Sequence, residues 1–130
     1  MIGIDTGVLI DLFRENESLR KFLEGIDEPL VTTIINYQEI FFGINPKKES
    51  FVGESNFYNE LFSNLEIYQL DKFSSDKSSN IFWYLNNMGK DIGKFDSLIA
   101  GILLANGIDK IITKNAKHFE NVKGLKVLSY

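Results

Sequence analysis

The feature that most constrains the fold is the segment from Ile92 to Gly107, which contains a long run without charge. Leu98 to Ala105 has no charged or strongly polar side chain, so a helix formed there is apolar on every face and must lie buried between other elements. The segment closes with Asn106-Gly107, a pair that tolerates the left-handed conformation at a helix end. We therefore expect a central, buried helix.

One carboxylate, Asp96, lies at the first turn of this helix. In one interpretation it is the helix N-cap and accepts a backbone N–H. In the other it has a functional role, because an apolar helix needs no acid at its start. This segment alone does not decide between them.

The chain has 130 residues, enough for one domain, and we expect residues 1–130 to form it. It has no cysteine, which excludes disulfides, thiolate metal sites and cysteine nucleophiles. The start, Met1 to Asp5, has no basic region or long apolar run typical of a signal peptide. No stretch approaches the ~20 apolar residues that span a membrane. We expect a cytoplasmic protein without membrane contact.

The charge is unevenly distributed. The net charge is −4, but residues 1–89 carry seven basic and fourteen acidic side chains, whereas residues 90–130 carry seven basic and four acidic. Such an asymmetry can place a basic rim beside an acidic pocket, although it can also arise by chance.

Short apolar strands alternate with amphipathic helices along the whole chain. Periodicity predicts strands at Met1 to Ile4, 30–33, 67–70, 108–113 and 125–128, with helices between them that include 34–44, 57–65 and 74–87. Lys114 to Phe119 is expected to be irregular or a single helical turn. This alternation is typical of βαβ units, so we predict an α/β fold with a mostly parallel sheet covered on both faces.

Polar side chains follow the ends of the predicted strands. Asp5 ends the first strand, Thr113 and Asn115 end the fourth, and Asp96 begins the helix leading into the fourth. Glu39 lies in the mostly apolar helix after the second strand. Because ligands of parallel sheets gather at the carboxyl ends of the strands, these groups are expected to meet at one edge.

Clustered carboxylates repel one another unless a cation lies among them. Oxygen ligands without cysteine, and without an adjacent histidine, suit Mg²⁺ or Mn²⁺ better than zinc. Such an ion can activate water and stabilise charge on a phosphodiester. The pattern therefore points to nuclease chemistry.

At this point the chain resembles the PIN-domain ribonucleases, in particular the toxins of VapBC-type toxin–antitoxin pairs. The resemblance covers nearly the whole chain. The segments that carry it are Ile4-Asp5-Thr6, Tyr37-Gln38-Glu39-Ile40, Ile92-Gly93, Asp96-Ser97-Leu98-Ile99-Ala100, Thr113 to Phe119 and Gly124-Leu125-Lys126-Val127.

The resemblance implies a three-layer α/β/α fold with a five-stranded parallel sheet in the order 3-2-1-4-5. It also implies Mg²⁺- or Mn²⁺-dependent cleavage of RNA, a homodimer and a separate antitoxin protein. The family's metal-binding acids correspond to Asp5, Glu39 and Asp96, and its hydroxyl positions correspond to Thr6 and Thr113. The fourth acidic position is Asn115, whose amide loses a charge and puts a second metal site in doubt.

Other polar residues have two interpretations each. Three lysines lie near the proposed cleft and either contact RNA phosphates or are solvated: Lys94, Lys114 and Lys117. Asp11 and Asp91 are interpreted as solvated surface acids. His118, the only histidine, is interpreted as structural, since no serine partner suggests a hydrolase triad.

Three functions are consistent with these sequence features. The main hypothesis is a metal-dependent endoribonuclease toxin that uses Asp5, Glu39, Asp96 and Asn115. The first alternative is a non-catalytic PIN scaffold that binds RNA or a protein partner, which the Asn115 departure favours. The second is a phosphoryl-transfer enzyme or receiver with Asp5 as the nucleophile, for which Lys114 is a loose match to the expected lysine.

Overall fold

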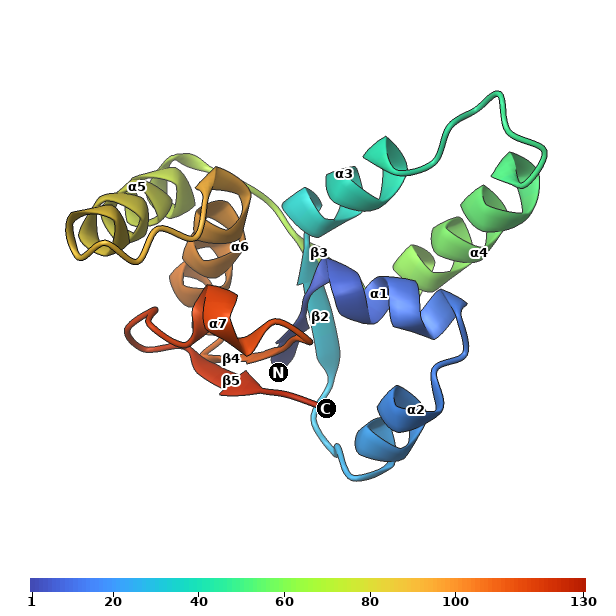
Figure 1. Ribbon diagram of the computed structural model, residues 1–130, viewed down its shortest axis with the longest axis horizontal. Helices are drawn as coiled ribbons and strands as arrows, with labels where there is room; N and C mark the ends of the chain where they lie inside the picture. Colours follow the sequence, from blue (N-terminus) through green and yellow to red (C-terminus); the bar gives the residue numbers. More distant parts are fainter.

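The computed structural model describes residues 1–130 and contains one five-stranded, fully parallel sheet with helices on both faces (Figure 1). The strand order is β3-β2-β1-β4-β5, which confirms the predicted α/β fold and its 3-2-1-4-5 order. The strands are β1 (Ile2–Ile4), β2 (Leu30–Thr33), β3 (Glu66–Tyr68), β4 (Lys110–Ile112) and β5 (Lys126–Leu128).

Seven helices connect the strands. They are α1 (Thr6–Phe13), α2 (Glu17–Glu24), α3 (Ile34–Phe42), α4 (Phe51–Ser63), α5 (Lys72–Asn87), α6 (Lys94–Ala105) and α7 (Ala116–Phe119). In Figure 1, α1 to α4 lie on one side of the sheet and α5 to α7 on the other. No helix is both long and apolar enough to cross a membrane.

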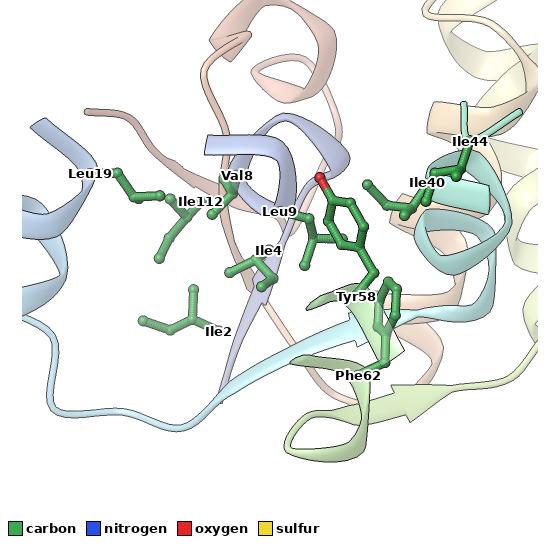
Figure 2. Close-up of a cluster of buried hydrophobic side chains, with 10 residues drawn as sticks. All are labelled: Ile2, Ile4, Val8, Leu9, Leu19, Ile40, Ile44, Tyr58, Phe62 and Ile112. Atoms are coloured by element: carbon green, nitrogen blue, oxygen red, sulfur yellow. The ribbon is translucent and has the colours of Figure 1, made fainter. Parts of the chain in front are cut away.

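A hydrophobic cluster fills the space under each group of helices. Figure 2 shows the first, in which Ile2 and Ile4 of β1 pack with side chains of α1, α2, α3 and α4. Val31 and Ile111, from the strands beside β1, belong to the second cluster with residues of α5, α6 and α7. Successive strand residues point to opposite faces, which is why one sheet supplies both cores.

The helix α6 is the buried element that its sequence predicts. Ile99, Ala100, Ile102 and Leu103 are almost fully inaccessible to solvent. Gly101 permits close packing on α5, because an added Cβ would lie 1.9 Å from the Ser78 hydroxyl oxygen and 2.8 Å from the Ser78 Cα. A methyl group at this position would therefore force the two helices apart.

Most predicted elements are confirmed, and the differences lie at their ends. The helix expected at 57–65 begins earlier, at Phe51, where a Ser55 hydroxyl donates to the Phe51 carbonyl at 2.6 Å. Gly53 and the polar residues around it weaken the apolar pattern there, so the periodicity starts late. The strand expected at 67–70 is Glu66–Tyr68.

Candidate active site

Asp5 lies at the carboxyl end of β1 and is also the N-cap of α1. Its Oδ1 accepts the backbone N–H of Thr6 at 2.8 Å, and its Oδ2 accepts the Thr113 hydroxyl at 3.0 Å. Thr113 follows β4, which pairs directly with β1, so the sheet register brings these two residues together. Asp5 is only 9% exposed, and no lysine or arginine pairs with it.

Glu39 reaches the same place from α3. The Thr6 hydroxyl donates to Glu39 Oε1 at 2.7 Å, and Asn36 Nδ2 donates to the Thr6 hydroxyl oxygen at 3.0 Å. Asn36 Nδ2 also lies 3.4 Å from Asp5 Oδ1. Thr6 and Asn36 thus connect two carboxylates that are far apart in the sequence.

Asp96 lies in the first turn of α6 and is not the N-cap, so the capping interpretation is wrong. The N-cap is Gly93, whose φ of 87° lies in the left-handed region that favours glycine. Asp96 Oδ2 lies instead 2.8 Å from Nδ1 of His118, a residue of α7. The carboxylate is therefore available for contacts outside its own helix.

The three carboxyl groups are costly to ionise. Burial raises the pKa of Asp5 despite its hydrogen bonds, and burial followed by the nearby Asp5 charge raises the pKa of Glu39. Burial raises the pKa of Asp96 to about 6, with the charges of Asp5 and Glu39 adding to the shift and His118 opposing it. The acids therefore form one electrostatically coupled group.

One open cavity of about 580 Å³ contains this group. Its polar lining residues are Asp5, Thr6, Glu39, Lys94, Asp96, Asn115 and His118. A donor set dominated by carboxylate oxygens fits Mg²⁺ or Mn²⁺ in its chemistry. However, no three acidic or histidine side chains are close enough together to hold one ion as they stand.

The remaining predicted residues fall into two groups. Asn115 and Lys94 line the cavity, and the Asn115 backbone N–H donates to the Thr113 hydroxyl oxygen at 3.0 Å. Lys114 and Lys117 do not line it. Lys114 Nζ lies 3.0 Å from an oxygen of Asp11, so the lysine that a receiver would need near Asp5 has another partner.

Asp11 requires a correction, because it is not solvated. It is 3% exposed, and besides Lys114 its carboxylate accepts the Tyr130 hydroxyl at 2.8 Å. Burial and the Asp11 carboxylate raise the pKa of this hydroxyl. Asp91, by contrast, is exposed as expected and accepts the Gly93 N–H.

Two residues of the site were not identified from the sequence. From the sequence, His118 is expected to be structural; in the fold it also lines the cavity and contacts Asp96. The sequence pattern alone assigns no role to Asn36, although an amide in the first turn of a mostly apolar helix directly after a strand is a detectable signal. Both contact an acid that the sequence did identify.

Comparisons with known proteins identify the family of this chain. The family model described as PIN domain matches residues 2–125, so this chain belongs to the PIN domain family. Members of the family are generally nucleases. A comparison with curated proteins finds no match.

Solved structures with the same fold come from toxin–antitoxin complexes. A chain of VapBC2 from Rickettsia felis, solved bound to a promoter DNA fragment, matches with a TM-score of 0.86 and 21% identity, covering 100% of this chain and 99% of that one. A chain of DNA-bound VapBC from Salmonella typhimurium matches at 0.84 and 20%, covering 99% and 98%. A chain of a toxin–antitoxin complex from Klebsiella pneumoniae matches at 0.77 and 19%, covering 98% and 96%.

Proposed function

We propose that this chain is an endoribonuclease that uses Mg²⁺ or Mn²⁺ to hydrolyse RNA phosphodiester bonds, and that it is the toxin of a toxin–antitoxin pair. The observation that carries the proposal is the meeting of Asp5, Glu39 and Asp96, from three separate segments, in one cavity without a lysine or arginine partner. Family membership supports the nuclease class.

A divalent ion bound among these oxygens would supply Lewis-acid stabilisation of the phosphodiester and lower the pKa of water. The protein's own contribution is to hold the carboxylates in position. Thr113 and the Thr6 N–H orient the two oxygens of Asp5, the Thr6 hydroxyl orients Glu39, and His118 orients Asp96. Asn115 adds a neutral amide to the cavity, and Lys94 adds a positive charge at its rim for an RNA phosphate.

The test compares variants of the acids with a matched control. Asp5→Asn and Asp96→Asn should each lower RNA cleavage by about 100-fold or more and abolish Mn²⁺ binding measured by calorimetry. Asp109→Asn should change neither, because this exposed acid precedes β4 and so lies at the opposite, amino end of the sheet. A fully active Asp5→Asn/Asp96→Asn double variant would end the proposal.

A second candidate is a PIN scaffold that binds RNA or a protein without cutting. The spacing of the acids within the shared cavity favours it, since no three of them are close enough to hold one ion as they stand. The departure at Asn115 favours it too. Purified protein that binds RNA but takes up no Mn²⁺ by calorimetry would establish this function instead.

We also propose that the chain binds a separate antitoxin protein and forms a homodimer. The similar solved structures are of VapBC and toxin–antitoxin complexes, which supports the first partner. Sedimentation of the purified chain alone and with the product of the neighbouring reading frame tests both partners. A chain that remains monomeric and binds no neighbouring gene product would contradict this part of the proposal.

A further inference from the structure

A second cavity is lined by residues of α5 and of the start of α6. These two helices lie next to each other in the fold (Figure 1). Its volume is about 360 Å³, and its lining includes Ser78, Phe82, Trp83, Lys94, Ser97 and Leu98. Lys94 lines both cavities, and Ser97 directly follows Asp96. The two cavities are therefore neighbours that share one cationic side chain.

Trp83 is the distinctive residue of this second cavity. It is the only tryptophan in the chain, and it is 58% exposed. Its ring meets Phe82 edge to face, with the centroids 5.3 Å apart and the planes at 80°. Phe82 thus supports the indole from one side while much of the ring remains open to solvent, an arrangement suited to stacking a flat ligand.

We propose that this cavity binds a nucleobase of the RNA strand, stacked on Trp83, next to the phosphodiester that is cleaved. The proposal rests on the nuclease function above and extends it by naming a substrate subsite. Lys94, placed between the cavities, would contact the phosphate that joins the stacked nucleotide to the cleaved one. Aromatic faces and a basic groove are the common elements of single-strand binding sites.

Charge distinguishes this cavity from a larger one beside α1 and α2. The larger cavity, of about 680 Å³, is lined by four acids against one cation, Arg20; the acids are Asp11, Glu15, Glu17 and Glu24. The cavity at Trp83 has Lys94 and no acid among its lining residues. A polyanionic strand would be repelled from the first and attracted to the second.

Size and hydrogen bonding favour a base over a protein partner. A volume of about 360 Å³ is at the lower end for small-molecule pockets, so it suits a single ring system better than a helix from a second copy. The Ser78 and Ser97 hydroxyls each donate at 2.8 Å to a backbone carbonyl of their own helix segment. With these donors already used, binding would depend on stacking and tolerate different bases.

The single tryptophan makes the test direct. Metal-free protein is titrated with short single-stranded RNA, either all uridine or all adenosine, and with an oligonucleotide of the same length that lacks bases. Stacking should quench the fluorescence of Trp83 with both RNAs and not with the abasic strand. Absence of quenching, or equal affinity for the abasic strand, would overturn the proposal.

Variants then separate stacking from general binding. Trp83→Ala should weaken RNA binding about 10-fold, whereas Trp83→Phe should retain most of the affinity. Phe42→Ala is the matched control, because Phe42 is an exposed aromatic at the end of α3 that lines neither cavity. This variant should bind RNA as the unchanged protein does. Unchanged RNA affinity in Trp83→Ala, with a change in sedimentation, would instead assign this surface to a protein interface.

Failure of the subsite and failure of the nuclease function give different results. If Trp83→Ala loses RNA affinity but the unchanged protein cleaves no RNA with Mn²⁺, the subsite stands and the nuclease proposal is wrong. If the unchanged protein cleaves RNA and Trp83→Ala leaves KM and kcat unaltered, the nuclease proposal stands and the subsite is wrong. Support for both requires a KM about 10-fold higher in Trp83→Ala with kcat within about twofold.

Discussion

Asp5 and Asp11 are both buried acids in the first helical region, but they have opposite surroundings. Asp11 has a lysine at 3.0 Å and accepts the Tyr130 hydroxyl at 2.8 Å. Asp5 accepts hydrogen bonds only from neutral groups. Its charge raises the pKa of both Glu39 and Asp96, which lie nearby. One buried charge is compensated, whereas the other is not.

Asp11 therefore stabilises the folded state, whereas the charges of the acids around Asp5 destabilise it. The ion pair with Lys114 and the hydrogen bond from Tyr130 connect Asp11 of α1 to two parts of the chain that are distant in sequence. The acids around Asp5 have no lysine or arginine partner, and the contact of His118 with Asp96 does not offset their burial, so their ionisation lowers stability. Neutralising the two groups should therefore change the free energy of unfolding in opposite directions.

The largest effect is expected at Lys114. Lys114→Met removes the only cation beside a 3%-exposed carboxylate, and it should lower the free energy of unfolding by about 3 kcal/mol. Urea denaturation at pH 7 measures this loss.

Asp11→Asn is the companion variant. It should cost less, about 1 kcal/mol, because the half-exposed Lys114 can hydrate and the amide oxygen can still accept the Tyr130 hydroxyl. Equal losses in the two variants would mean that the pair does not depend on burial of the acid.

In the acidic cavity, removing a charge is expected to raise the free energy of unfolding. Asp96→Asn should raise the free energy of unfolding of the metal-free protein at pH 7, because it removes a partly buried charge next to Asp5 and Glu39. We expect a gain of about 1 kcal/mol, well below the full value of the pKa shift, since solvent screens this carboxyl. Thermal denaturation in the presence of a chelator measures it, and a loss of stability would contradict the comparison.

The charge of Asp96 should also make the free energy of unfolding depend on pH. The pKa of Asp96 is about 6 in the folded chain and near 3.8 when unfolded, so the folded state binds a proton first as the pH falls. The free energy of unfolding should therefore rise as the pH is lowered from 7 toward 5, and this gain is complete below 3.8. In Asp96→Asn the rise should be smaller; an identical pH profile would assign it to other groups.

The smallest effect is expected at Lys94 and Lys117, two candidate RNA-binding lysines that form no ion pair with an acid. Lys94→Gln should weaken binding of single-stranded RNA about threefold and flatten its salt dependence, because Lys94 lines both cavities. Lys117→Gln should have less effect, since Lys117 is exposed but lines neither cavity. Neither change should alter thermal stability, and an equal effect of both would mean that only overall charge matters.

Local pattern predicts much of this molecule, and it fails where the partners are distant. The alternation of strands and helices predicts the sheet, and the rule for strand ends brings Asp5, Glu39 and Asp96 to one edge. Asp11 is different, because helical periodicity places it beside Glu15 on an outer face. It is buried by Lys114 and Tyr130, which come from the other end of the sequence and which no local pattern connects to it.

His118 and Asn36 show a second limit. Their role follows from the side chains that they contact. Those contacts depend on the exact positions of α7 and α3, and hydrophobic periodicity does not predict these positions. Asp96 illustrates the reverse case. An acid near a helix start has a simple local interpretation as a cap, and only the placement of the helix start at Gly93 excludes it.

The pairing of β1 with β4 has a consequence for synthesis of the chain. The acidic cavity combines residues from Asp5 near the start with Asn115 and His118 near the end, and it cannot assemble until the last of these has left the ribosome. A nascent or truncated chain therefore lacks the complete site, and the proposed cleavage of RNA would be deferred until translation is almost finished.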